Sequence, residues 1–214
     1  MPKSKHIQVL LLLSLTASAQ SMKRTTDGHP DFSGLWQART LAAWDVEDHP
    51  AAYGIPAGKG VVVGDKIPYQ PWALEKRTEL MKNAANDPQA HCYLPGVPRA
   101  VHTPFPWQIV QKPGLVVILY EYPHGIRIIH TDGSREHPRG PDLLNTWMGD
   151  SIGHWDGDTL VVDVVGFNDR TWFDMAGNFH SDALHVVERY SPVDAKTIAY
   201  EATSKIPKFT PVPG

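Results

Sequence analysis

The sequence predicts a mainly β protein in which an antiparallel meander closes into a barrel. Asp156-Gly157 is a strong hairpin pattern between two strand-like segments, residues 147–155 and 159–163. Other short apolar segments follow one another at close spacing, with turn residues between them. Helical patterns do not alternate with these strands, which argues against a parallel α/β fold. Together these three observations favour the barrel.

The expected elements begin with a strand anchored by Phe32 and Trp36. A long N-terminal loop region follows, rich in proline and glycine over residues 45–71. Pro71 opens the one short helix, expected to run to about residue 85. The remaining strands are expected over residues 107–111, 115–122, 125–131, 147–155, 159–163, 184–190 and 197–203.

Residues 1–19 have the pattern of a secretory signal peptide. A basic start precedes the apolar run Ile7–Leu15, and Ala17-Ser-Ala19 supplies small residues at a cleavage site. The run is shorter than the roughly 20 residues that a membrane span needs. We therefore expect a periplasmic or secreted protein with residues 20–30 as a disordered linker and residues 31–214 as a single β-barrel domain.

Charge, cysteine content and histidine spacing limit the kinds of partner and cofactor that we expect. Loss of residues 1–19 removes two lysines and no acid, so the formal net charge of −3 becomes −5. An acidic chain without a basic stripe does not favour nucleic acid. A single cysteine, Cys92, cannot form an internal disulfide and is expected to be buried. The eleven histidines show neither His-x-His nor His-Glu-x-x-His spacing, so we expect no metal and no other cofactor.

Several motifs resemble a known family. They are Pro30–Trp36, Pro95–Arg99, Arg127–Gly133, Gly149–Asp163 and His185–Tyr190. These segments are similar to those of exported bacterial proteins of mostly unassigned function, which in turn are similar to lipocalin-like (calycin) barrels. The resemblance implies the barrel and the export but no reaction. Ser134 stands where the family pattern has arginine, and the pattern implies a further element after Gly214.

The long central motif places polar and aromatic side chains on opposite faces of one strand, because alternate residues point to opposite sides. Asp150 and His154 share a face and lie roughly 13 Å apart along the strand. Trp147 and Trp155 share the other face, where two glycines leave either a ligand slot or a bend. Either face could line the barrel. Gly149-Asp-Ser151 lies in a hairpin, so it does not fit a hydrolase nucleophile.

Two further groups add candidates. One comprises His180, His185 and Glu188, and the other comprises Glu121, Arg127, His130 and His137, in which Glu121 and Arg127 could pair across neighbouring strands. The predicted catalytic residues are His154, Asp150, His185, His180, Glu188 and Arg127. The predicted ligand-binding residues are Trp147, Trp155, Trp172, Glu121 and Tyr120.

Two functions fit these residues. The first is a cofactor-independent enzyme that acts on a small aromatic or polycyclic compound by general acid–base chemistry, as a lyase, isomerase or hydrolase. Arg127 would then stabilise an oxyanion. The alternative is a periplasmic lipocalin-like protein that binds a small hydrophobic ligand. The enzyme hypothesis fails if His154, His185 and Glu188 all face solvent. The sequence does not specify an oligomeric state.

Overall fold

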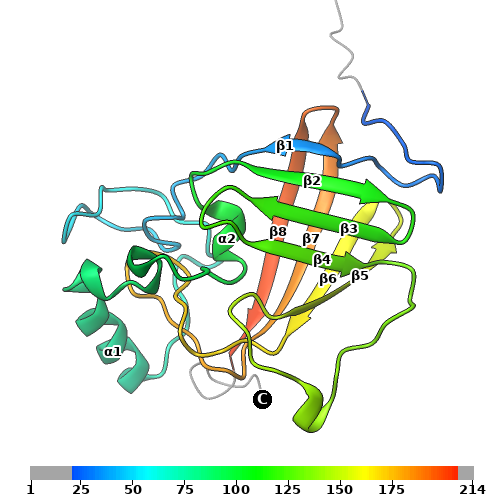
Figure 1. Ribbon diagram of the computed structural model, residues 1–214. Coiled ribbons are helices and arrows are strands. Elements are labelled where there is room, and N and C mark those ends of the chain that lie inside the picture. The colour runs from blue at the N-terminus through cyan, green and yellow to red at the C-terminus, as the bar shows by residue number, and fades with distance from the viewer. Residues whose placement is uncertain (1–20, 207–214) are drawn as a thin grey trace, which may run out of the picture.

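The computed structural model describes residues 21–206, so the expected signal segment, residues 1–19, lies outside the described residues. Eight strands form one curled, mostly antiparallel sheet in the order β1 to β8 (Figure 1). The strands are β1 (Gly34–Trp36), β2 (Trp107–Lys112), β3 (Leu115–Tyr120), β4 (Ile126–His130), β5 (Asp150–Asp156), β6 (Thr159–Val165), β7 (His185–Asp194) and β8 (Thr197–Lys205). The mainly β prediction is confirmed.

The sheet is a half-barrel, because β1 and β8 do not pair with each other within residues 21–206. In Figure 1, β1–β4 lie across β5–β8, so that the sheet curls over its own inner face. Ile109, Ile118 and Ile129 from the first four strands belong to one core cluster with Val162 and Val186 from β6 and β7. The core therefore sits on the concave side of the sheet.

The junction between β4 and β5 departs from the expected meander. These two strands are parallel, with the single registered pair His130↔Ile152, whereas every other pair in the sheet is antiparallel. Parallel neighbours need a crossing connection rather than a tight turn. Residues 131–149 supply that connection, and they carry side chains across the outer face of β5.

The hairpin of β5 and β6 turns one residue later than the sequence indicates. Asp156 pairs with Thr159, so the two turn residues are Gly157 and Asp158. Gly157 has φ +58°, and Asp158 is not among the residues with positive φ. Glycine with positive φ at the first central position is typical of a type II′ turn.

Helices are few. α1 (Pro71–Met81) begins at Pro71 as expected but ends before residue 85, and a 3₁₀ turn follows at Ala84–Asn86. α2 (Arg99–His102) is a single buried turn that the sequence did not indicate. Two more 3₁₀ turns lie at Pro88–His91 and Gly140–Asp142. No helix within residues 21–206 is long and apolar enough to cross a bilayer.

Cys92 is exposed, contrary to the expectation that it is buried. It follows the 3₁₀ turn Pro88–His91 with a left-handed backbone, φ +60°. The turn ends at the surface and directs the next residue outward. Residues 24–30, assigned above to a linker, contact the β5–β6 hairpin: Arg24 pairs with Asp158, and His29 stacks on Trp155.

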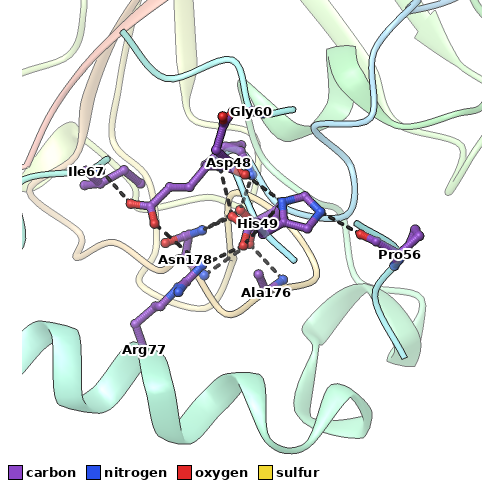
Figure 2. A network of polar contacts seen from close by, with 12 residues as sticks. Asp48, His49, Pro56, Gly60, Ile67, Arg77, Ala176 and Asn178 are labelled. Atoms are coloured by element: carbon purple, nitrogen blue, oxygen red, sulfur yellow. Dashed lines mark hydrogen bonds and ion pairs between the residues drawn. The ribbon is translucent and has the colours of Figure 1, made fainter. Parts of the chain in front are cut away.

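A buried polar network ties the segment before α1 to the rest of the molecule. Figure 2 shows Arg77 reaching from α1 into this network, close to Asn178. Asp45 accepts hydrogen bonds from Arg77 at 2.7 Å and from the Asn178 side chain at 3.1 Å. Asp174 accepts from four N–H groups, including the backbone of Val46, while its burial raises its pKa to about 7. This network joins loops and has little exposure, so we assign it a structural role.

Candidate functional site

The concave face contains a buried ion pair between Arg127 of β4 and Glu188 of β7. Both side chains are almost completely buried, and two nitrogens of the guanidinium donate to the two carboxylate oxygens, one of them at 3.2 Å. Ser151 accepts from the same guanidinium at 3.0 Å. The hydroxyls of Tyr190 and Tyr200 donate to Glu188 Oε1 at 3.0 and 2.9 Å. The pair is therefore bonded on all sides.

The tyrosines around this pair remain hydrogen-bond donors. Burial, with the Glu188 carboxylate nearby, raises the pKa of Tyr190 and of Tyr200 well above the ordinary value. The hydroxyl of Tyr120 lies next to the arginine of the pair, 3.4 Å from Arg127 Nη1. Because these polar groups satisfy one another, the cluster can hold the half-barrel together without a ligand.

The expected pairing of Glu121 with Arg127 is wrong. Arg127 points inward, whereas Glu121 is exposed just after the end of β3. Tyr120 points inward, so Glu121, one residue later, continues the outward-facing set of that strand. The partner of Arg127 comes instead from β7, on the opposite side of the core.

The three tryptophans that were expected to form a ligand wall each lie in a different environment. Trp147 stacks on Tyr93 with 4.6 Å between ring centroids. Trp155 stacks on His29 with 4.4 Å between centroids. Trp172 is buried and bridges to the backbone of Phe179. Trp147 and Trp155 therefore each stack on a different ring, and Trp172 is part of the buried core.

The glycines between Trp147 and Trp155 do not open a slot either. A methyl group at Gly153 would lie 2.8 Å from Ile129 Cγ2 and 2.9 Å from Thr131 Cγ2. At Gly149 it would lie 2.8 Å from a methyl group of Val164. Neighbouring residues already fill the space, so these glycines permit close packing.

His180 is a structural residue. It is buried, and its Nε2 accepts from the Thr171 hydroxyl while Nδ1 donates to the Ser181 carbonyl oxygen. This is the pattern of a neutral ring. Burial lowers the pKa of His180, in agreement with that form. None of these contacts involves His185 or Glu188, so the expected grouping of His180 with these two residues is not formed.

The outer face of β5–β7 gathers the remaining candidates around Asp163. In the sheet register Ile152 pairs with Asp163, and Asp163 pairs with Val187. Asp150 and His154 lie two residues to either side of Ile152, and His185 lies two residues before Val187. Asp163 belongs to β6, which lies between β5 and β7. Because diagonal neighbours share a face, the side chains of Asp150, His154 and His185 surround that of Asp163.

His137, from the connection 131–149, completes a continuous hydrogen-bonded chain on this face. His137 Nδ1 lies 2.6 Å from Asp150 Oδ2, and its Nε2 lies 3.1 Å from Asp163 Oδ2. His185 Nε2 bonds the other oxygen of Asp163. Arg135 donates to the free oxygen of Asp150. The order is thus Arg135, Asp150, His137, Asp163, His185, and we call these five residues the outer-face chain.

The hydrogen bonds specify what each imidazole can do. An ionised carboxylate only accepts hydrogen bonds, so with both aspartates ionised His137 can bond both of them only by donating from both ring nitrogens. His185 donates through Nε2 to Asp163 and has no partner at Nδ1 within residues 21–206. This arrangement leaves a lone pair on Nδ1, as in aspartate–histidine pairs that act as general bases.

A shallow open depression of about 430 Å³ lies beside the outer-face chain. It is lined by Arg135, Glu136, His137, Arg139, Ile152, His154 and Asp163. His154 is exposed and has no side-chain hydrogen bond within the described part of the chain. Asp163 is 38 % exposed, so solvent and small molecules can reach the chain. Among residues 21–206, no three His, Cys, Asp or Glu side chains are placed to hold a metal ion.

Asp163 and Arg135 are the members that the sequence analysis did not select, and His137 was named there only as part of another group. Asp163 could have been found from the hairpin. A two-residue turn puts residues 150, 152 and 154 on the same face as residues 161, 163 and 165. Arg135 and His137 lie in a long connection, whose path no periodic pattern indicates.

Comparison with known proteins identifies no relative. No family model, no curated protein and no solved structure matches this chain. The fold and the site therefore define only a class, a curled β half-barrel with a histidine–carboxylate chain on its outer face.

Proposed function

We propose that the protein is an enzyme that carries out general acid–base chemistry on a small molecule, at the depression beside the outer-face chain. The observation that carries this proposal is the alternation of two histidines and two carboxylates in one hydrogen-bonded line, partly open to solvent. Fixed imidazole groups of this kind serve enzymes as proton donors and acceptors near neutral pH.

The roles follow from which ring nitrogens are already bonded. Within residues 21–206, His154 and His185 have ring nitrogens without hydrogen-bond partners, so each can accept a proton from a substrate. His137 is held between Asp150 and Asp163, so its ring can act as a fixed proton donor. Asp163 orients two imidazoles at once and is a positioning residue.

The lining of the depression suggests the substrate. Ile152 contributes an apolar side chain to the lining, and His154 and Arg139 contribute exposed polar side chains. A small ring compound with a polar or anionic substituent fits this combination. Isomerisation or elimination by proton transfer needs no cofactor, and hydrolysis with an activated water needs none either. With residues 1–19 as a signal peptide, the reaction would take place in the periplasm or outside the cell.

The alternative, a lipocalin-like carrier, would place its ligand on the concave face. There the Arg127–Glu188 pair and its tyrosines bond one another, so a ligand would have to displace them. We therefore favour the outer face.

The first experiment locates the binding site without knowledge of the reaction. Protein with ¹⁵N-labelled histidine is titrated with a panel of aromatic acids, phenols and enones. We expect a binder to move the ring resonances of His137, His154 and His185, and to leave those of buried His102 and His180 in place. A panel member that binds and perturbs the tyrosines beside Glu188 instead would support the carrier and overturn the proposal, as would a panel without any binder.

The second experiment uses Asp163→Asn on a substrate found in this way. The amide cannot accept from both His137 and His185 as the carboxylate does, so we expect turnover to fall by at least about 100-fold. The free energy of unfolding should change by no more than about 1 kcal/mol, because the site is partly exposed. His91→Asn, at a distant exposed histidine, is the matched control. Full activity of Asp163→Asn would remove the outer-face chain from the mechanism.

A further inference from the structure

The outer face of β1–β4 is apolar and uncovered. Leu35 of β1, Val110 of β2, and Ile126 and Ile128 of β4 are 77, 48, 62 and 55 % exposed. This face points away from β5–β8, toward the viewer in Figure 1. Large aliphatic side chains gathered on one face of a soluble protein mark a binding surface.

The sheet register places these residues in one patch, which a single polar residue, Gln108, interrupts between Leu35 and Leu119. Val110 pairs with Val117, and Val117 pairs with Ile128. In the next outward row Leu119 pairs with Ile126. Every residue of β3, Leu115–Tyr120, is apolar or aromatic, a pattern typical of a strand that is covered on both faces. Here the core covers only one of them.

Two opposite charges mark the ends of the patch. Lys112 points outward at the end of β2, and Glu121 continues the outward set of β3 at the other end. Six residues of strand, about 20 Å, separate Glu121 from Leu115, the register partner of Lys112. Neither side chain has an ion pair or a side-chain hydrogen bond within residues 21–206.

We propose that this face is the interface of a homodimer, in which a second copy of the chain packs its β1–β4 face against the first. A two-fold axis in the interface plane and perpendicular to the strands would reverse the partner's strands. Lys112 would then lie over the partner's Glu121, and the apolar rows would meet between them. An axis along the strands would instead set Lys112 against its own copy.

Charge selects a second copy over other occupants. The patch carries Lys112 at one end and Glu121 at the other with mainly apolar residues between them, so its own two-fold image brings these opposite charges together. Nucleic acid or an anionic membrane surface would meet Glu121 at one end and only one lysine at the other. Packed sheets lie about 10 Å apart, which suits side chains of this size.

The interface and the proposed active site are on different parts of the sheet. The patch occupies β1–β4, whereas the outer-face chain lies on β5–β7 and the connection 131–149. Each dimer would therefore present two open sites, and the dimer proposal does not depend on the proposed enzyme function.

A charge-swap experiment tests the arrangement. The mass of the purified protein is measured by light scattering after size-exclusion chromatography, over a wide concentration range. We expect a dimer for the wild type. Lys112→Glu and Glu121→Lys should each raise the dissociation constant at least tenfold, and the double swap should restore most of the affinity. Lys66→Glu, at an exposed lysine elsewhere, should leave the dimer unchanged.

A second variant tests the apolar part. Ile128 is exposed, so Ile128→Lys should fold normally by circular dichroism and yet run as a monomer. A wild type that remains monomeric at the highest concentration overturns the proposal. So does a dimer that survives Ile128→Lys, or single charge variants that the double swap fails to rescue.

Discussion

The two faces of β5–β7 carry the same kinds of side chain and use them differently. On the inner face Glu188 is buried and bonded to Arg127, Tyr190 and Tyr200. On the outer face Asp163 is bonded to His137 and His185, yet it stays partly exposed, and in the described part of the chain Nδ1 of His185 has no partner. A polar cluster whose groups are all satisfied stabilises the fold. One with an open, accessible group can act on another molecule.

The largest effect should come from breaking the inner cluster. Glu188→Gln removes the negative charge and leaves the Arg127 guanidinium buried without compensation. We expect a loss of about 3–5 kcal/mol in the free energy of unfolding, measured by urea denaturation. The double variant Arg127→Met/Glu188→Leu should be more stable than the single one, because no unpaired charge remains. A loss below about 1 kcal/mol for Glu188→Gln would mean that water reaches the pair.

A smaller effect concerns acid. Burial lowers the pKa of His102 to about 4, while its ring donates to the Phe173 carbonyl oxygen. The unfolded chain binds a proton at about pH 6.5 and the folded one does not until about pH 4. Stability from this residue is therefore fully present above pH 6.5, and about 3 kcal/mol is lost as pH falls to 4. The free energy of unfolding, measured by urea denaturation from pH 7 to pH 4, should fall less steeply with pH in His102→Gln than in the wild type. The same pH dependence in both proteins would contradict the assignment.

The smallest effects compare two positions of one strand. Gly153→Ala forces a methyl group against Ile129 and Thr131 on the inner face, so we expect a loss of about 1–3 kcal/mol. His154→Ala, on the outer face of the same strand, should change stability by no more than about 0.5 kcal/mol. Thermal unfolding of the pair provides the measurement. Equal effects at the two positions would remove the distinction between the faces.

Much of the fold could be predicted because strand patterns are local. Apolar alternation and turn residues indicated β2, β3 and the β5–β6 hairpin to within two or three residues. The parallel step from β4 to β5 could not be foreseen, because it depends on where residues 131–149 lead the chain. The open edge between β1 and β8 likewise depends on the curvature of the whole sheet.

The candidate site was predicted in part. Asp150, His154 and His185 were selected, and all three lie on the outer face beside Asp163. The alternation of residues left open which face was inside, and the structure puts Ser151, Gly153 and Trp155 of β5 inward, whereas Trp147 lies before this strand. Arg127 and Glu188 were selected as catalytic groups, but their pairing across the core joins strands far apart in the sequence, which no local pattern reveals.

The parallel step between β4 and β5 also bears on how the chain folds. β2–β4 and β5–β8 are each built from neighbouring hairpins, whose contacts are close in sequence and form early. Between these two groups of strands, β4 and β5 pair through one registered residue pair, His130↔Ile152. We therefore expect the junction between β4 and β5 to form late and to open first. Its amide hydrogens should then exchange with solvent faster than those at the centre of either group of strands.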